Sequence, residues 1–419
     1  LARGSLTAIT NAFVRDQGVT GLTLNPATRA RSHVQRWLGA LTAAIPCTPS
    51  DPDRCRVELT SAAILAHRDI EDPLGELSLS SRRVASRGAR VSEQARLRYR
   101  LSDRLALTGS AAQEFETLDL ALDGGERRRS RRAVSRGAAS ATFALTRALD
   151  LNALAAIEYH GTRGANPTDT VQPSGRVGAR LRLHESFSIS ANVGRYARVP
   201  TLGELHGISP IVLGNALLAP ERSTSFDLGA KLSTALGSSS LYAELFGFAR
   251  LASDLIAYRQ SQLGVVRPYN TKGARILGVE LAAGAQLFHH LRAELSLTVL
   301  DPRDTSGELG QESLLPYQAR VVAAPSLEVF QGPIAALGLD RASLAARLHH
   351  RSPLRVDPAG VIPVIPAQTT LDLELGLLFL RRRLGAQLRL ANLNDSRNAD
   401  VLGLPLPGRS VHGSMEVTW

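Results

Sequence analysis

The chain ends in Gly413-Ser414-Met415-Glu416-Val417-Thr418-Trp419, where small or apolar residues alternate with polar ones up to a terminal aromatic. Successive side chains of a β-strand point to opposite faces, so Met415, Val417 and Trp419 would share one face. In a membrane strand that face contacts lipid, the polar face lines a watery lumen, and the Trp ring sits at headgroup level. A half-buried strand of a soluble sandwich shows the same alternation, so this segment alone leaves both readings open.

The same two-residue period recurs along most of the chain. In Ala95-Arg96-Leu97-Arg98-Tyr99-Arg100-Leu101 three arginines fall on one face, and residues 292–299 and 371–375 alternate in the same way. This is the period of strands and not of helices, and about eighteen segments show it. The sequence therefore predicts an all-β chain.

The connections between these segments fall into two classes that alternate along the chain. Short turns are expected at 102–103, 237–239 and 289–290. Long polar connections are expected at 119–132, 163–174, 200–221, 259–272, 303–318, 353–368 and 394–409. An up-and-down barrel has this alternation, whereas a Greek-key sandwich has no reason for it. We therefore expect a transmembrane antiparallel up-and-down β-barrel whose last strand descends and whose first segment, residues 1–16, ascends.

The formal charge of +11 comes almost entirely from arginine, since Lys231 and Lys272 are the lysines of the chain. The densest cluster is Arg127-Arg128-Arg129-Ser130-Arg131-Arg132, which would suit nucleic acid. Aromatics make up 5% of the chain, however, and the other arginines are scattered singly along alternating strands. A loop cluster that faces anionic lipopolysaccharide or an acidic ligand fits better, and a solvated charge run without a role also fits. We expect no nucleic-acid partner.

Two cysteines, Cys47 and Cys55, flank a turn rich in Pro and Asp at 48–54. They predict either a local disulfide formed in an oxidising compartment or two unpaired thiols. The chain has no run of about 18 apolar residues, so we expect no transmembrane helix. It begins at Leu1 without an initiator Met or a signal segment, and we expect its natural start to lie upstream.

The most specific signal is a set of four segments in a fixed order. The first is a long connection that contains Arg198-Val199-Pro200-Thr201-Leu202-Gly203-Glu204-Leu205, Gly214-Asn215 and Leu218-Ala219-Pro220-Glu221-Arg222-Ser223. Pro200 and Pro220 would end strands, and Gly-Asn would tolerate left-handed turn geometry. Glu221 would cap neighbouring backbone amides.

The other three segments are 270–280, 315–320 and 391–395, and the last is continued by 403–410 before the final strand. The motif residues are Pro200, Glu204, Gly214, Asn215, Pro220, Glu221, Asn270, Gly278, Glu280, Pro316, Asn392, Gly408, Arg409 and Trp419. Their order and spacing resemble the barrel of TonB-dependent outer-membrane receptors from about residue 186 onward. The resemblance implies that these residues are structural more than ligand-binding.

The resemblance also implies a barrel of 22 strands around an N-terminal plug, in the outer membrane of a Gram-negative bacterium. Residues 1–419 would then be a partial receptor β-barrel, with the plug, the TonB-contacting segment and about four strands upstream. The implied function is energy-coupled uptake of a scarce ligand. A ferric siderophore is the leading expectation, although receptors of the same fold also take up cobalamin, haem, saccharides and nickel chelates.

The implied partners are outer-membrane lipid and lipopolysaccharide, a TonB-type energy-coupling protein that binds the upstream part, and a small-molecule chelate. Two other functions remain open at this point. One is a passive porin-type channel of eighteen strands, and the other is a soluble all-β adhesin or lectin-like protein. A plug encoded upstream would favour the receptor, and a signal peptide directly before Leu1 would favour the porin.

Arginine and tyrosine suit an anionic, aromatic-rich ferric chelate, because guanidinium groups pair with carboxylates and stack on rings. The candidate ligand contacts are Arg195, Tyr196, Arg198, His206, Tyr258, Arg267 and Tyr269, followed by Arg259, Arg347, His349 and Arg351. Lumen-lining charge or an interfacial aromatic girdle is the alternative reading.

We expect no metal site at His289-His290 or His349-His350, because adjacent strand residues point to opposite faces. Motifs for nucleophilic, phosphate-binding or zinc chemistry are absent from the sequence, so we expect neither an enzyme nor a cofactor.

Overall fold

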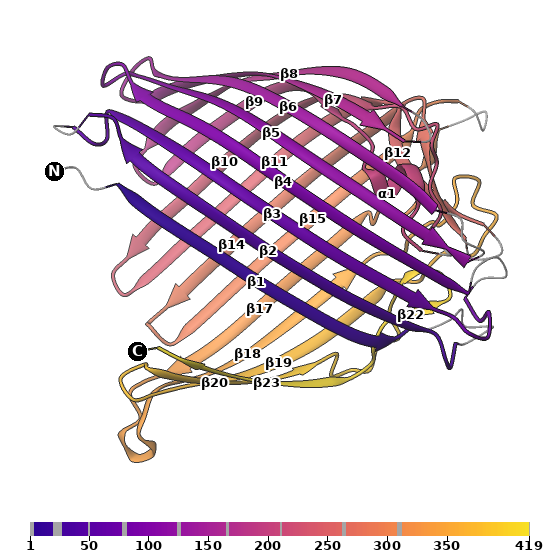
Figure 1. The fold of residues 1–419 in the computed structure, drawn as a ribbon. Helices are drawn as coiled ribbons and strands as arrows, with labels where there is room; N and C mark the ends of the chain where they lie inside the picture. The colour runs from indigo at the N-terminus through magenta and orange to yellow at the C-terminus, as the bar shows by residue number, and fades with distance from the viewer. Residues whose placement is uncertain are drawn as a thin grey trace. The chain divides into compact units, whose positions relative to one another are not determined.

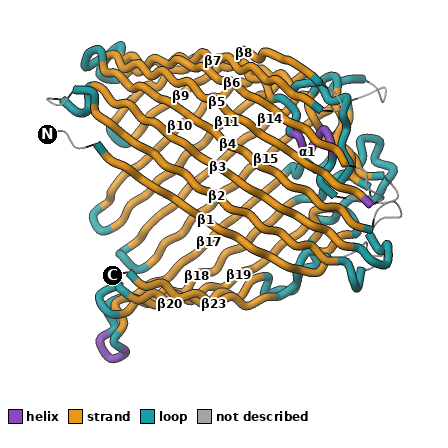
Figure 2. The backbone as a smooth tube through the Cα atoms, in the orientation of Figure 1, coloured by secondary structure: helices purple, strands orange, loops and turns teal. Residues whose placement is uncertain are grey.

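The computed structural model describes residues 4–19, 27–48, 51–77, 82–123, 127–164, 167–209, 212–261, 265–307 and 312–418. Strands dominate these residues, and helix is confined to short segments (Figure 2). No helix in the described ranges is long and apolar enough to cross a membrane. The terminal Trp419, expected at a membrane interface, lies outside the described residues.

The strands form an antiparallel succession along the chain (Figure 1). The long strands are β1 (Ser5–Gly18), β2 (Arg31–Pro46), β3 (Cys55–Glu71), β4 (Arg83–Arg100), β5 (Leu105–Leu122), β6 (Arg127–Ala144), β7 (Leu149–Arg163), β8 (Thr168–His184), β9 (Phe187–Arg198), β10 (Glu221–Leu236), β11 (Ser239–Ser253), β14 (Ala274–Leu287), β15 (Leu291–Asp304), β17 (Val321–Gln331), β18 (Leu339–Arg351), β19 (Gln368–Phe379), β20 (Leu384–Ala391) and β23 (Ser410–Val417).

Shorter elements lie in the connections. They are the helix α1 (Leu202–His206), the 3-10 helix η2 (Ala335–Leu337) and the strands β12 (Leu255–Gln260), β13 (Val266–Thr271), β16 (Ser313–Leu314), β21 (Ala399–Val401) and β22 (Leu404–Pro405). Setting these five short strands aside leaves eighteen long ones within the described residues, which agrees with the sequence-based count. The all-β, up-and-down class is confirmed.

The chain divides into two compact units, which we describe separately. The first unit comprises Leu1–Leu181, Asn192–Phe226 and Leu251–Ala274. Within it each strand from β1 to β8 pairs antiparallel with the next, so the strands form a meander without crossovers (Figure 1). Such continuous ladders satisfy the backbone donors and acceptors that would otherwise be unpaired in lipid.

One face of this meander is apolar and exposed. The register pairs odd-numbered residues with odd-numbered ones from β3 to β8, as in Val91 with Phe115 and Gly137 with Ile157. The large exposed hydrophobic side chains on these six strands all lie at odd positions: Leu59, Leu65, Val91, Leu97, Leu107, Phe115, Phe143, Leu151, Ile157, Tyr159, Val171, Val177, Leu181 and Leu183. A continuous apolar face of this extent is typical of a lipid-facing surface.

The opposite face carries a lattice of ion pairs between neighbouring strands. Arg90 lies 2.9 Å from Glu116, and Arg136 lies 3.1 Å from Glu114 and 3.4 Å from Glu158. All of these residues occupy even positions. Charged groups on this face therefore compensate one another, which is the arrangement expected of a polar interior face.

The second unit comprises Arg182–Ala191, Asp227–Arg250 and Arg275–Trp419. Its strands β15, β17, β18, β19, β20 and β23 pair antiparallel in that order. Met415 and Val417 of β23 are exposed, and they pair with Ala386 and Leu384 of β20. The expected alternation of the C-terminal segment is thus present through Val417.

The short turns lie where the sequence predicted them, but several long connections are shorter or more ordered than expected. The connection predicted at 119–132 shrinks to 123–126, and the one at 163–174 shrinks to 164–167. The one at 259–272 overlaps the hairpin β12–β13, which begins at Leu255 and ends at Thr271. These polar residues remain in strands because their charges pair locally, as Arg129 does with Asp119 at 2.6 Å and Arg163 with Asp169 at 2.8 Å.

Cys47 and Cys55 are joined by a disulfide, with their Cα atoms 5.3 Å apart. The bridge closes the connection between β2 and β3, and the Cys47 amide also donates to the Cys55 carbonyl at 2.9 Å. The strands here are therefore held together by both a covalent link and a ladder hydrogen bond.

The face assignment predicts opposite effects for two adjacent residues near the middle of β7. Ile157→Arg should lower the free energy of unfolding in lipid vesicles by about 2–4 kcal/mol, because Ile157 is 55% exposed on the apolar face. Ala156→Arg, on the ion-paired face, should lower the free energy of unfolding by less than about 1 kcal/mol. Urea titration of the two variants in vesicles measures the difference, and equal losses would contradict the assignment.

Candidate functional site: the loop between strands β9 and β10

The connection between β9 and β10 is built around the short helix α1. β9 ends at Arg198, two residues before Pro200, and β10 begins directly after Pro220, as the prolines predicted. Thr201 is the N-cap: its hydroxyl accepts from the Glu204 amide, and the Glu204 carboxylate accepts from the Thr201 amide at 2.7 Å. This reciprocal capping box fixes the start of the helix and places the Glu204 carboxylate beside the end of β9.

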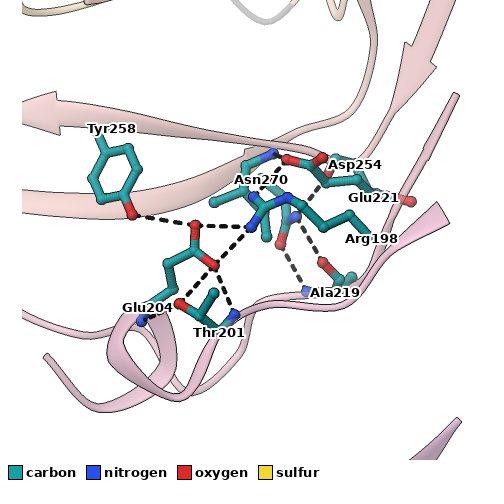
Figure 3. A network of polar contacts seen from close by, with 9 residues as sticks. Arg198, Thr201, Glu204, Ala219, Glu221, Asp254, Tyr258 and Asn270 are labelled. Atoms are coloured by element: carbon teal, nitrogen blue, oxygen red, sulfur yellow. Dashed lines mark hydrogen bonds and ion pairs between the residues drawn. The ribbon is translucent and has the colours of Figure 1, made fainter. Parts of the chain in front are cut away.

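Arg198 is the centre of a polar network at this position (Figure 3). Its Nη1 donates to both carboxylate oxygens of Glu204, at 3.1 and 2.9 Å, and its Nη2 donates to Glu221 Oε1 at 2.8 Å. The side chains of Glu204 and Glu221 are 9% and 5% exposed. One guanidinium thus neutralises two nearly buried carboxylates from both ends of the loop.

The network shifts the pKa values of its members. Burial opposes ionisation of Glu204, but hydrogen bonds from Arg198 and Thr201 outweigh it, so the Glu204 pKa lies below its usual value. Burial, together with the adjacent Glu204 charge, raises the pKa of Tyr258 to about 12. Tyr258 therefore stays protonated and donates its hydroxyl to Glu204 Oε1 at 3.2 Å.

Asn270 of β13 joins the loop to the hairpin β12–β13 (Figure 3). Its side chain accepts from the Ala219 amide at 2.8 Å and donates to the carbonyls of Ala219 and Asp254, at 3.0 and 2.6 Å. Glu221 Oε1 accepts from the Ile256 amide at 2.8 Å, a contact across 35 residues, whereas the sequence predicted capping of neighbouring amides. The loop and the hairpin are consequently held as one body within the first unit.

Gly214 and Asn215 serve the same assembly in a way the sequence did not predict. Neither has the positive φ expected of a left-handed turn. A Cβ at Gly214 would lie 2.4 Å from the Gly207 nitrogen, so glycine is required by close backbone approach. The Asn215 amide donates to the Glu204 carbonyl at 2.8 Å, and its side chain donates to the Pro268 carbonyl at 3.1 Å.

The model of one protein family, described as TonB dependent receptor-like, β-barrel, matches residues 88–394. The chain belongs to this family. The family consists of transport receptors in the outer membrane of Gram-negative bacteria, so the receptor is an outer-membrane protein.

Solved structures of TonB-dependent receptors share the fold at low sequence identity. The copper transporter OprC has a TM-score of 0.71 and 15% identity, over 100% of this chain and 76% of that one. The ferric preacinetobactin receptor BauA from Acinetobacter baumannii has a TM-score of 0.73 and 11% identity, over 98% of this chain and 69% of that one. The ferric yersiniabactin uptake receptor FyuA from Yersinia pestis has a TM-score of 0.69 and 15% identity, over 99% of this chain and 67% of that one. No curated protein sequence matches the receptor.

Several predicted ligand contacts take part in the receptor's internal network. Arg198 and Tyr258 bind Glu204, and His206 bonds through Nε2 to the Ser130 hydroxyl at 2.7 Å. Burial, and then the charges of Arg128 and Arg132, lower the pKa of His206 and favour its neutral form. The structure thus uses these side chains to hold the loop in place.

Other predicted contacts lie on accessible faces. On β9, Arg195 points to the opposite face from Tyr196 and Arg198, because strand residues alternate. On the hairpin, Arg259 pairs in register with Arg267, and the Arg259 guanidinium lies 5.4 Å from the centre of the Tyr269 ring. Arg259 and Arg267 are exposed, so this hairpin face presents two cations and one aromatic ring.

The predicted ligand contacts of the second unit also interact with neighbouring strands and connections. Arg347 forms two hydrogen bonds with Glu374, and Arg351 binds Asp400 at 3.0 Å. His349 pairs in register with Thr370 across β18 and β19. The first and last of these contacts join β18 to β19, and the Arg351 contact ties the end of β18 to the connection that contains Asp400.

The motif residues of the second unit make local turn and packing contacts. Asn392 exchanges hydrogen bonds with Ser396, and the Arg409 amide donates to Asp395 at 3.3 Å, close to Gly408. A Cβ at Gly278 would lie 2.4 Å from the Phe248 ring. Pro316 is buried in a turn that continues into the half-buried Tyr317, and Glu280 is exposed on β14.

Two residues that matter here, Ser130 and Arg132, were treated from sequence as part of a loop cluster. They lie in β6, where both are buried while their neighbours Arg129 and Arg131 are exposed. The alternation within Arg127-Arg128-Arg129-Ser130-Arg131-Arg132 was the signal that could have found them.

A carboxylate also joins the connection before β2 to the connection after β3. We call this contact, between Glu76 and residues 28–30, the Glu76 clasp. Glu76 accepts from the amides of Thr28, Arg29 and Ala30, at 2.9, 2.8 and 3.2 Å. Hydrogen bonds from Arg29 and Thr28 lower the Glu76 pKa to about 2. A carboxylate that accepts several amide hydrogens is strongly favoured in its charged form.

We expect Arg198→Met to destabilise the loop by about 2 kcal/mol, because two buried carboxylates lose their cation. The loss should be smaller than for a fully buried pair, since the Arg198 side chain is 42% exposed. Hydrogen exchange of the Asn215 and Ile256 amides measures the change. Lys231→Met is the control, because its pair with Glu244 is exposed on both sides and should contribute below about 1 kcal/mol. Equal effects of the two variants would contradict the central role of Arg198.

The Glu76 clasp should respond to acid in a defined window. Because folding lowers the pKa of Glu76, its stabilising contribution is present above about pH 4.5 and is lost as pH falls through about 2. The amide chemical shifts of Arg29 and Ala30 should titrate near pH 2, and Glu76→Gln should abolish that titration. Glu71→Gln, a change at an exposed carboxylate outside the clasp, should leave it unaltered. A midpoint at the ordinary glutamate value would be incompatible with the clasp.

Proposed function

We propose that this receptor imports a scarce small-molecule chelate across the outer membrane with energy delivered by a TonB-type coupling protein. The observation that carries the proposal is the network centred on Arg198, which gathers the motif residues Glu204, Asn215, Glu221 and Asn270 into one assembly. A passive channel has no need for a connection that is fixed to a hairpin by side chains from both of its ends. A receptor that must hold a ligand at its mouth benefits from such a preorganised surface.

We propose a ferric siderophore as the ligand class. The exposed hairpin face with Arg259, Arg267 and Tyr269 supports an anionic, aromatic-rich chelate, since like charges placed opposite each other are relieved by a bound anion. The names of two structural neighbours refer to ferric preacinetobactin and ferric yersiniabactin. A third neighbour is a copper transporter, so copper belongs among the ligands to be tested.

A passive channel is the second candidate, because the described residues contain eighteen long strands. Outer-membrane lipid and lipopolysaccharide are the proposed surroundings of the apolar odd-numbered face in either case. The two candidates differ in whether transport requires the coupling protein.

The test is uptake by cells that express the full-length gene and lack other siderophore receptors, with the coupling protein present or deleted. We expect saturable uptake of one ferric siderophore that requires the coupling protein. Arg267→Gln should weaken ligand binding about tenfold, whereas Arg147→Gln, in a short turn at the other strand ends, should not. Uptake that persists without the coupling protein would favour the channel, and coupled uptake of copper alone would reject the siderophore.

A further inference from the structure

The densest basic cluster of the chain is divided between two faces of β6. Arg127, Arg129 and Arg131 lie at exposed odd positions. Ser130 and Arg132 lie on the other face and are 2% and 6% exposed. A buried arginine requires compensation of both its hydrogen bonds and its charge, so the surroundings of Arg132 decide what this half of the cluster does.

The surroundings of Arg132 leave its guanidinium incompletely satisfied. Its Nε donates to the Thr162 hydroxyl at 3.1 Å, but its buried Nη2 has no hydrogen-bond acceptor among the described residues. Glu116, its register partner on β5, forms its ion pair with Arg90 at 2.9 Å.

Two other carboxylates, Glu114 and Glu204, act on Arg132 electrostatically, but each forms an ion pair with a different arginine. Glu114 binds Arg136 at 3.1 Å, and Glu204 binds Arg198 at 2.9 Å. The Arg132 charge therefore lacks a close counter-ion of its own among the described side chains.

Arg132 lines a pocket of about 230 Å³ beneath the loop between β9 and β10. The polar wall includes Arg222, His206, Thr168 and Thr170, and the apolar wall includes Leu205 and Leu218. Asp169 also lines the pocket, but its carboxylate is held by Arg163 at 2.8 Å and Tyr159 at 2.9 Å. The volume far exceeds the ~30 Å³ share of one water and suffices for a small organic anion.

We propose that this pocket binds an oxyanion, the carboxylate or phosphate group of a small molecule, with Arg132 as the principal donor. A water molecule in the pocket would supply a hydrogen-bond acceptor to the guanidinium but no negative charge, whereas an oxyanion supplies both. The hydroxyls of Thr168 and Thr170 and the cation of Arg222 complete a lining suited to such a group. Because β6, β8 and the loop all contribute to the walls, the bound anion would also link the loop to the strands.

The experiment uses the full-length receptor purified in detergent, with no metal and no coupling protein, so its outcome is independent of the transport test. Sodium citrate and sodium phosphate are titrated in separate arms by calorimetry at constant ionic strength, with sodium chloride as the reference. We expect saturable binding in at least one arm, and the stronger arm identifies carboxylate or phosphate. Arg132→Gln should weaken it about tenfold or more, and Arg129→Gln, on the exposed face of the same strand, should leave it unchanged.

A second variant tests the same pocket in case Arg132→Gln misfolds. Leu218→Trp fills the pocket from the loop side without changing the guanidinium, and it should abolish binding while the protein keeps its heat-modifiable migration on gels. Three outcomes would overturn the proposal: no saturable heat in either arm, equal weakening by Arg129→Gln and Arg132→Gln, or unchanged binding in Leu218→Trp.

Discussion

The pairing of backbone hydrogen bonds is the constraint on which the rest of this receptor depends. In lipid every amide and carbonyl needs a partner within the protein, and a strand obtains its partners from its two neighbours. The unbroken ladders from β1 to β8 meet this requirement. They also fix the side chains, because the antiparallel register keeps odd-numbered residues on one face from β2 to β8, with the parity exchanged at β1.

Charge placement follows from that parity. Arginines and carboxylates at even positions meet across neighbouring strands, as Arg90 and Glu116 do, and they neutralise one another away from lipid. The loop between β9 and β10 uses the same chemistry in a more buried setting, where Arg198 compensates Glu204 and Glu221 together. Arg132 departs from the rule, since its neighbouring carboxylates are already paired. That departure distinguishes a candidate binding position from structural charge.

Much of the candidate site was visible in the sequence as a list of residues, but not as an assembly. The motif order identified Glu204, Glu221 and Asn270, and proline marked the strand ends. The contact between Glu221 and the Ile256 amide joins residues 35 positions apart, and the Asn270 contact to Ala219 spans 51. Spacing along a chain does not report such contacts, because the path of a long connection depends on packing. For the same reason the sequence did not show that Arg198 and Tyr258, predicted as ligand contacts, both bind Glu204.

The sequence by itself determined the all-β class, the up-and-down order and the approximate number of strands, because a two-residue period with turn residues at regular intervals is a local property. The tertiary structure decided where strands end, since pairs such as Arg129 with Asp119 keep polar residues in the ladder beyond the apolar span. It also decided which arginines pair with a carboxylate among the described residues. A charge is structural or functional according to the partners that folding brings to it, and those partners come from distant parts of the chain.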